Sequence, residues 1–364
     1  MKLKEILSFF DQWAPNQLAE EYDNVGLLVG KPDQEINRIL VSLDATENVV
    51  EEAISRNCDL IISHHPILFK GIKKLNGQNY VARCVEKAIK NGISLLAVHT
   101  NLDNVQTGVN HRIAMKLGLE KPRILRPMKN QLQILTFFVP EVQKESVLVA
   151  LHNAGAGNIG NYSHCSFSSQ GQGRFLPQPG SNPFSGTIGK PEEADEIRIE
   201  MILPKYKAST VISALKASHP YEEVAYFISN LENVWQDSGA GMVGDLPEEI
   251  AFDDFIQRVK KEFSLSMIKF TRPIKEKVKR IALCGGSGFF LLPDAKASGA
   301  DVYLTADIKY HEFFDAEDQI VLMDIGHFES EQFTSSLIIE KLSIQFPSIA
   351  VLLSEMKTNP VFYA

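Results

Sequence analysis

Cysteine and long apolar runs are both scarce in this sequence. Its 364 residues include four cysteines and no Cys-x-x-Cys pair, which disfavours a disulfide framework or a thiolate zinc site and favours a reducing, cytoplasmic compartment. No apolar run approaches the ~20 residues that cross a bilayer. The amphipathic N-terminal stretch also has no apolar core followed by a small-residue cleavage site. We therefore expect a soluble protein with no membrane segment and no secretory signal.

Basic residues are fewer than acidic residues in this sequence. The sequence holds 37 Lys and Arg against 45 Asp and Glu, a formal net charge of −8. Such a chain repels a polyphosphate backbone unless a local basic patch overcomes its overall charge, so nucleic acid is disfavoured as a partner. Hydrophobic residues at 44% and charged residues at 23% are the composition of an ordinary globular protein. The length indicates two or three domains.

Apolar runs alternate with amphipathic segments in two parts of the chain, residues 1–128 and 237–364. In both parts an apolar run of a few residues is followed by a helical pattern, as in RILVSLDA followed by ENVVEEAISRN. This alternation predicts βαβ units and parallel sheets covered by helices on both faces. The expected fold class is therefore α/β.

The two parts also resemble each other in sequence. The segment from Asn57 to Ser63 aligns with that from Gly299 to Thr305 at a constant offset of 242, and an arginine precedes both by about 20 residues. We interpret this as a duplication that gives two similar α/β halves packed as one domain. Chance similarity between βαβ units is the alternative.

The intervening residues 129–236 have a pattern of their own. Strand, proline turn and helix occur twice, with Pro140 and Pro204 at equivalent places 64 residues apart. Two such units in succession predict a ferredoxin-like α+β domain inserted between the halves of the larger one. Within it, the stretch from Ser168 to Pro191 is rich in Gly, Ser, Pro and Gln, and we expect a long exposed loop there.

The sequence Ser63-His64-His65-Pro66 directly follows an apolar run that is expected to be a strand. Ligands collect beyond the carboxyl ends of strands in parallel sheets, so both imidazoles are well placed to bind one. Side chains of adjacent extended residues point to opposite sides, and Pro66 keeps His65 extended. The pair therefore suits two separate metal ions better than one. The alternative is a buried, hydrogen-bonded histidine beside a surface one.

Two further strand ends supply similar groups. One is followed by His99 and Asp103, whose carboxylate could bridge two cations, and another by His327 and Glu331. The last two are four residues apart and share a helix face, although a solvated helix start would look the same. Imidazole and carboxylate together suit Zn²⁺, Mn²⁺ or Fe²⁺ without choosing among them. The expected ligand set is His64, His65, Asp103, His327 and Glu331.

Such a pair of ions indicates hydrolytic chemistry. Two divalent metals about 3.5–4 Å apart polarise a substrate oxygen and lower the pKa of a bridging water, which gives hydroxide at neutral pH. Glu331 or His99 would then carry the proton. The predicted activity is hydrolysis of a nucleotide or a related small molecule. The alternative is a non-catalytic metal-binding or regulatory interaction protein.

The same segments resemble the NGG-interacting-factor-three family of dinuclear metal-centre proteins, often labelled GTP cyclohydrolase I type 2 homologues. The resemblance covers about 1–128 and 240–364 and lies in YDNVGLLVG, IISHHP, HTNLD, TADIKYHE and GHFESE, in that order. The family's ligand pattern falls on the five residues named above, with no departure. The resemblance further implies a homohexamer built as a trimer of dimers, and an insertion like that of PII and CutA proteins.

Other polar residues near these motifs are weaker candidates. His311 and Asp307 follow another strand and could support the metal ligands, with helix capping as the alternative for Asp307. Asn24 is either a turn residue or a donor to the cavity. The CGGSG segment at 284–288 could cradle a phosphate, but a tight turn is the better interpretation because the P-loop spacing is absent. The lysines at 70, 73 and 74 could steer an anion or simply be solvated.

Overall fold

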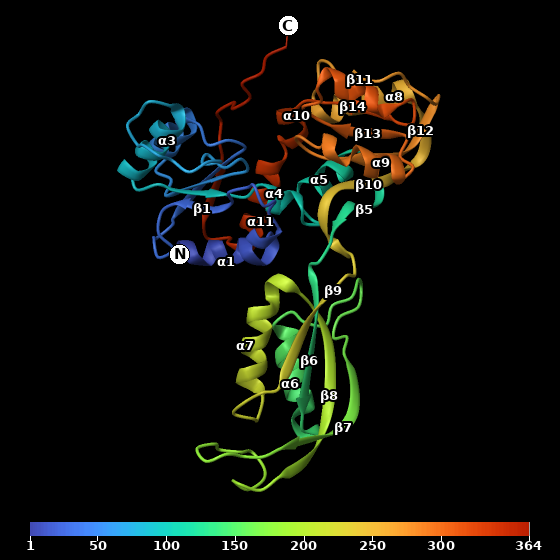
Figure 1. Ribbon diagram of the computed structural model, residues 1–364. Coiled ribbons are helices and arrows are strands. Elements are labelled where there is room, and N and C mark those ends of the chain that lie inside the picture. The colour runs from blue at the N-terminus through green and yellow to red at the C-terminus, as the bar shows by residue number, and fades with distance from the viewer. Residues whose placement is uncertain (364) are drawn as a thin grey trace. The chain divides into compact units, whose positions relative to one another are not determined.

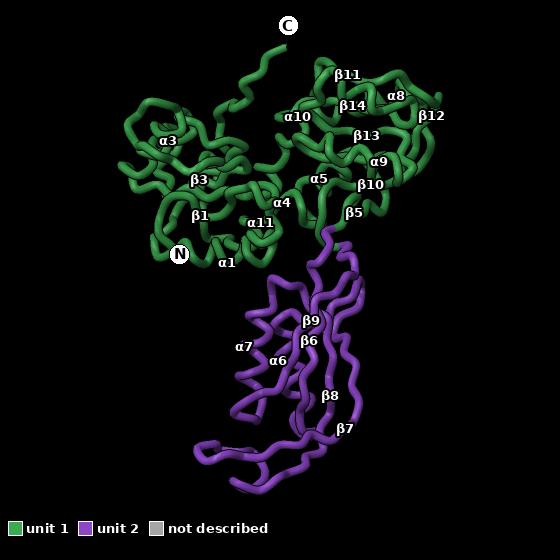
Figure 2. Tube along the Cα trace, in the orientation of Figure 1, with its two compact units in different colours: residues 1–127, 237–364 green, residues 128–236 purple. Residues whose placement is uncertain are grey.

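The computed structural model describes residues 1–363. The chain forms two compact units, one from residues 1–127 and 237–364 and the other from residues 128–236 (Figure 2). The first unit is discontinuous in sequence, and two neighbouring strands link it to the second. No helix among the described residues is long and apolar enough to cross a membrane.

The first half of the larger unit is built on a five-stranded sheet of order β1-β4-β3-β2-β15. Strands β15, β2, β3 and β4 are parallel, and β1 pairs antiparallel with β4. Helix α3 lies on one side of this sheet, and helices α1 and α11 lie on the other (Figure 1). The strands are β1 Gly26–Val29, β2 Arg38–Ser42, β3 Leu60–Ser63, β4 Ser94–Ala97 and β15 Ala350–Leu353, and the helices are α1 Leu3–Trp13, α2 Glu47–Ser55, α3 Tyr80–Lys90 and α11 Thr334–Gln345.

The second half is built on a six-stranded sheet of order β11-β14-β13-β12-β10-β5. Its three central strands β12, β13 and β14 are parallel, and β11 pairs antiparallel with β14, as β1 does with β4 in the first sheet. The strands are β5 Glu120–Met128, β10 Trp235–Ala251, β11 Lys269–Phe270, β12 Lys277–Leu283, β13 Val302–Thr305 and β14 Val321–Asp324, with helices α8 Phe252–Phe263 and α9 Leu292–Ala297. The predicted α/β class with two similar halves is confirmed.

Residues 242 positions apart make equivalent hydrogen bonds in the two halves. Asp59 Oδ2 accepts two backbone N–H groups beside it, and Asp301 Oδ2 does the same in the other sheet. The donors are Asn37 and Arg38 in the first case and Lys279 and Arg280 in the second. Because these bonds fix how one strand enters the sheet beside the next, the two halves share construction as well as sequence.

The smaller unit holds a four-stranded sheet of order β7-β8-β6-β9 in which the paired strands are antiparallel. Along the chain its elements are strand, helix, two strands, helix, strand: β6 Leu132–Val139, α6 Lys144–Asn153, β7 Phe167–Phe175, β8 Glu192–Pro204, α7 Ala208–Ser218 and β9 Tyr226–Leu231. The core between sheet and helices includes Phe137, Ile199 and Leu215.

One expectation for this unit was wrong. The stretch from Ser168 onward was expected to be loop, but residues 167–175 are strand β7 and only residues 176–191 are irregular. The reason is tertiary: each residue of β7 pairs with one of β8, from Phe167 with Glu200 to Phe175 with Glu192. These pairs satisfy the backbone of a Gly- and Ser-rich segment whose own β propensity is low.

We predict that Asp301→Asn lowers the free energy of unfolding by about 1–3 kcal/mol at pH 7, because two partly buried backbone hydrogen bonds lose their charged acceptor. Burial raises the pKa of Asp301, but hydrogen bonds from Lys275 and the N–H groups of Lys279 and Arg280 outweigh burial and lower it overall. The stabilisation by the wild-type carboxylate is therefore complete above the unfolded-state pKa of about 3.9 and is lost as the pH falls through the lower folded value.

Urea unfolding of wild type and variant between pH 7 and pH 3 measures this difference. The exposed Asp318, which pairs with Arg272 at the surface, provides the control Asp318→Asn, which should change stability by less than about 1 kcal/mol. A difference between wild type and Asp301→Asn that does not shrink below pH 4 would contradict the assignment.

Candidate metal centre

Three strand ends of the larger unit meet at one place. Strand β3 ends at Ser63, and His64 and His65 follow it directly. Strands β4 and β14 each lead within a few residues into a short helix, α4 (Thr100–Asp103) and α10 (His327–Glu331). Because β3 and β4 belong to one half and β14 to the other, the residues that meet come from both sheets.

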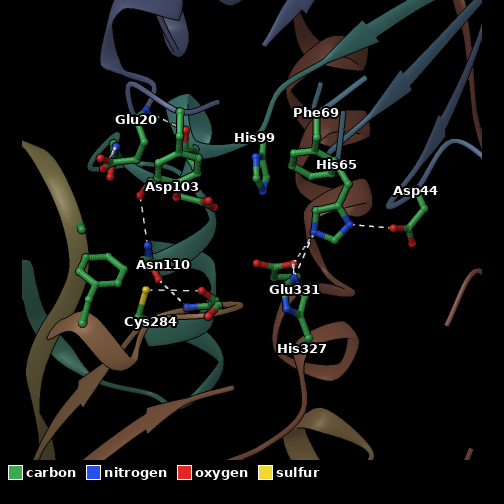
Figure 3. Close-up of a pocket in the computed structure, with 17 residues that line it drawn as sticks. Glu20, Asp44, His65, Phe69, His99, Asp103, Asn110, Cys284, His327 and Glu331 are labelled. Atoms are coloured by element: carbon green, nitrogen blue, oxygen red, sulfur yellow. Dashed lines mark hydrogen bonds and ion pairs between the residues drawn. The ribbon is translucent and has the colours of Figure 1, made fainter. Parts of the chain in front are cut away.

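Glu331 lies at the centre of the cluster. Its Oε2 is 3.0 Å from His65 Nε2 and 3.1 Å from His327 Nε2, and its Oε1 is 3.8 Å from His64 Nε2. His64 Nε2 is also 3.7 Å from Asp103 Oδ1. Figure 3 shows His65, His327 and Glu331 pointing toward one another. All five residues expected as ligands are thus brought together.

Two buried atoms in this cluster have no hydrogen-bond partner among the described residues, His64 Nε2 and Asp103 Oδ1. His64 is fully buried, and its Nδ1 is 2.8 Å from the carbonyl oxygen of Val98, which holds the proton on Nδ1 and leaves a lone pair on Nε2. An imidazole lone pair and a carboxylate oxygen that face each other without a hydrogen are both acceptors. A cation between them satisfies both, so these residues fit a metal ion.

Two sets of ligand atoms within 4.8 Å of one another share Glu331: His64, Asp103 and Glu331 form one set, and His65, His327 and Glu331 the other. The shortest distances assign Oε1 of Glu331 to the first set and Oε2 to the second. The carboxylate shared by these two sets is therefore Glu331, whereas Asp103, which was expected to be able to bridge two cations, belongs to the first set. Helix α4 places Asp103 beside His64 and Glu331, and α10 carries Glu331 between the imidazoles. A third set consists of His64, His65 and His99, of which His65 and His99 line the cavity beside the cluster.

The pKa values of the histidines and carboxylates in this cluster show that the buried carboxylates need positive charge beside them. Burial disfavours imidazolium at His65 and His327, but hydrogen bonds to carboxylates outweigh it and raise the pKa to about 9 and about 10. Burial also raises the pKa of Glu331, but the surrounding imidazoles overcome it and hold the pKa well below its usual range. Burial and the nearby Glu331 raise the pKa of Asp103. In the chain alone, protons supply the charge that a cation would otherwise supply.

Carboxylates hold the outer nitrogens of three of the histidines. Asp44 Oδ1 is 2.7 Å from His65 Nδ1, and Asp307 Oδ2 is 2.6 Å from His327 Nδ1. Asp23 Oδ2 is 2.9 Å from Nδ1 of His99. Such partners fix the ring orientation and the tautomer and make the inner nitrogen a better ligand. Asp307 was expected near the ligands and lies there.

Sequence reasoning missed Asp44, Asp23 and Thr358. Asp44 follows the end of β2 by two residues, so the strand-end argument applied to the other ligands would have found it. Thr358 donates its hydroxyl to Asp44 Oδ2 from a segment near the end of the chain, and no local pattern predicts that contact.

Two other expected residues lie outside the cluster. His311 is exposed and packs against the rings of Tyr310 and Phe314, so it does not support a ligand. The side-chain amide of Asn24 donates to the carbonyl oxygen of Leu68 and thereby ties the loop after His65 to a turn, and Asn24 is not among the described residues that line the cavity. The turn interpretation of Asn24 therefore fits the structure better than that of a cavity donor.

A cavity of about 380 Å³ opens beside the cluster, lined by His65, His99, Asp103, His327 and Glu331 among others. Gly286 lies between two residues that line it, Gly285 and Ser287. Its φ is +60°, and a Cβ at this position would be 2.2 Å from Glu331 Oε1 and 3.3 Å from His327 Nε2. Glycine is required here for both its backbone conformation and its lack of a side chain.

Comparison with known proteins places the chain in a family. The family model for Duf34/NIF3 (NGG1p interacting factor 3) matches residues 1–360, and the chain belongs to this family. A relative from Bacillus subtilis, named GTP cyclohydrolase 1 type 2 homolog, is 38% identical over 98% of this chain and 97% of its own.

Solved structures agree with this assignment. The crystal structure of a Bacillus cereus protein related to NIF3 is similar with a TM-score of 0.88 at 36% identity, covering 100% of this chain and 99% of that one. A Staphylococcus aureus protein, SA1388, is similar with a TM-score of 0.78 at 30% identity over the same shares of the two chains.

We predict that Gly286→Ala lowers metal affinity by about tenfold or more, because the added methyl group collides with Glu331 Oε1. Gly299→Ala is the matched control, since Gly299 has a similar φ of +72° but its Cβ would have only Arg280 Nη1, at 3.9 Å, as a neighbour. Both variants bear the same backbone strain, and only the first should bind less metal. Titration with Zn²⁺ under a competing chelator measures the affinity, and equal losses in the two variants would show that strain alone is responsible.

Proposed function

We propose that this protein is a metal-dependent hydrolase that holds two divalent cations, Zn²⁺, Mn²⁺ or Fe²⁺, around Glu331. The observation that carries the proposal is the pair of buried acceptors without a partner, His64 Nε2 and Asp103 Oδ1, next to a carboxylate shared by both sets of ligands. Two such cations lower the pKa of a bound water to near neutrality. The name that relatives bear, GTP cyclohydrolase 1 type 2 homolog, supports hydrolysis as the reaction class.

His99 is the residue best placed to carry a proton. Its Nδ1 is held by Asp23, which fixes the tautomer with the proton on Nδ1 and leaves Nε2 free as a base. His99 also lines the cavity beside the ligand cluster. Glu331 was the other candidate, but both of its oxygens face imidazole nitrogens, so it serves as a ligand and has no oxygen left for proton transfer.

Further proposals come from the family to which the chain belongs. We propose a cytoplasmic homohexamer, built as a trimer of dimers, with residues 128–236 as a PII/CutA-like module. The order of strands in that unit, β7-β8-β6-β9, supports a ferredoxin-like arrangement. Light scattering of the intact protein would determine the number of chains.

The test combines metal content with turnover. Elemental analysis of the purified protein should give two divalent ions per chain, and Glu331→Gln or His64→Ala should lose at least one of them. His99→Gln should keep both ions and lose about 10²–10⁴-fold in kcat, the usual contribution of a positioned base. The exposed His311, which is not among the described residues lining the cavity, gives the control His311→Gln, which should retain metal and turnover.

Different results separate the alternatives. Two tightly bound ions with no hydrolysis of any nucleotide, nucleoside or base would favour a protein that stores or senses metal. Turnover that survives in Glu331→Gln would place the chemistry elsewhere in the chain.

A further inference from the structure

No lysine or arginine is among the described residues that line the cavity beside the metal ligands. Glu20, Asp44, Asp103 and Glu331 of the same lining are carboxylates. Apart from bound metal ions, sites that bind phosphate groups use Lys, Arg or free backbone N–H groups as donors. The first two kinds of donor are therefore missing from this wall.

The backbone N–H groups of the glycines beside the cavity are committed elsewhere. The glycine-rich loop at 284–288 borders the cavity and is where a phosphate cradle would be sought. Its glycine N–H groups already donate within the protein: Gly285 to Asn110 Oδ1, Gly286 to Ser330 Oγ and Gly288 to Thr305 Oγ1, each at 2.9 Å. The loop is a tight turn held by side chains and offers these donors to no ligand.

Nearby cations do not reach the cavity. Lys70, Lys73 and Lys74 are exposed and outside its described lining. Arg126 lies over the ring of Phe290, but its guanidinium is paired with Asp294. One interpretation of the lysine run was that it steers an anion toward the site. No lysine or arginine of the described lining would bind such an anion inside the cavity.

The charge of the bound metals does not change this balance. Two divalent cations bring four positive charges, which the four carboxylates of the lining neutralise. Asp23 and Asp307, in contact with His99 and His327, add two more carboxylates just behind the lining. With neutral histidines, the loaded centre is then formally negative by two charges and repels a polyanion.

The remaining surface of the cavity suits a planar ring. Tyr22, Phe69 and Phe290 line it, and the ring of Phe69 stands nearly perpendicular to that of His99 with centroids 5.6 Å apart (Figure 3). The volume of about 380 Å³ lies within the range of small-molecule sites. Aromatic side chains and few charges favour an aromatic ligand of low charge.

We infer that the cavity binds an uncharged aromatic heterocycle, as a free base or nucleoside, in preference to the same heterocycle carrying phosphate groups. This inference rests on the proposed function for the presence of metal ions but not for turnover. The inference disagrees with the triphosphate in the name of the relatives, because the described lining offers no lysine or arginine to pair with phosphates.

Calorimetric titration of the intact, Zn²⁺-loaded protein tests the inference. The ligands are the four common bases and nucleosides with the matching 5′-monophosphates and triphosphates, and metal content is measured after each titration. At least one nucleoside or base should bind, and its triphosphate should bind about tenfold or more weakly at low salt, with a smaller difference at high salt because repulsion is screened. Tighter binding of the triphosphate, or no binding of any uncharged member, would overturn the inference.

A variant pair isolates the electrostatic cause. Ser287 lines the cavity, so Ser287→Lys introduces the missing cation and should improve triphosphate binding about tenfold or more. Lys73→Ala removes a cation outside the cavity and should leave the preference unchanged. A metal-loaded Ser287→Lys protein with no gain for triphosphate would contradict the explanation. Binding is measured without turnover, so the two hypotheses can fail separately. Absence of hydrolysis would disprove the proposed function and leave the preference for an uncharged ligand standing. Hydrolysis of a tightly bound triphosphate would disprove that preference and leave the proposed function standing.

Discussion

The burial of one carboxylate constrains the whole of the larger unit. Glu331 is 3% exposed, and a charge so far from water must be compensated by neighbours of opposite sign. Three imidazoles surround it, and two of them are supplied by the other half of the unit. The two sheets can therefore pack together only in an arrangement that brings the end of β3 to helix α10, so stability and site geometry have the same origin.

The duplicated halves contribute to this site unequally. Asp59 and Asp301 make the same backbone contacts 242 residues apart, which shows that the architecture repeats. The site residues do not repeat: the position equivalent to His65 is Asp307, which faces the outer nitrogen of His327. One half presents imidazoles at that position, and the other presents a carboxylate that orients an imidazole. A symmetric scaffold thus carries an asymmetric centre.

Much of the site was predictable because it depends on strand ends. Apolar runs are strong local signals, and the residues after β3, β4 and β14 can be located from them directly. That Glu331 belongs to two of the sets of candidate ligand atoms was not predictable, since it depends on where the short helices α4 and α10 point. The hydrogen bond from Thr358 to Asp44 and the position of His311 outside the cluster also depend on tertiary packing. Strand β7 could not be predicted from local sequence either, because its composition is typical of a loop and its pairing with β8 makes it a strand.

The two strands that lead to and from the smaller unit are neighbours, which determines what kind of segment can connect them. Strands β5 and β10 are neighbours in the second sheet, and Gly239 near the start of β10 approaches the backbone of Arg126 and Pro127 near the end of β5. The whole of residues 128–236 therefore occupies the place of a hairpin connection. A short turn there would keep every strand of the sheet in position, so evolution or protein engineering can exchange the module while the α/β scaffold persists.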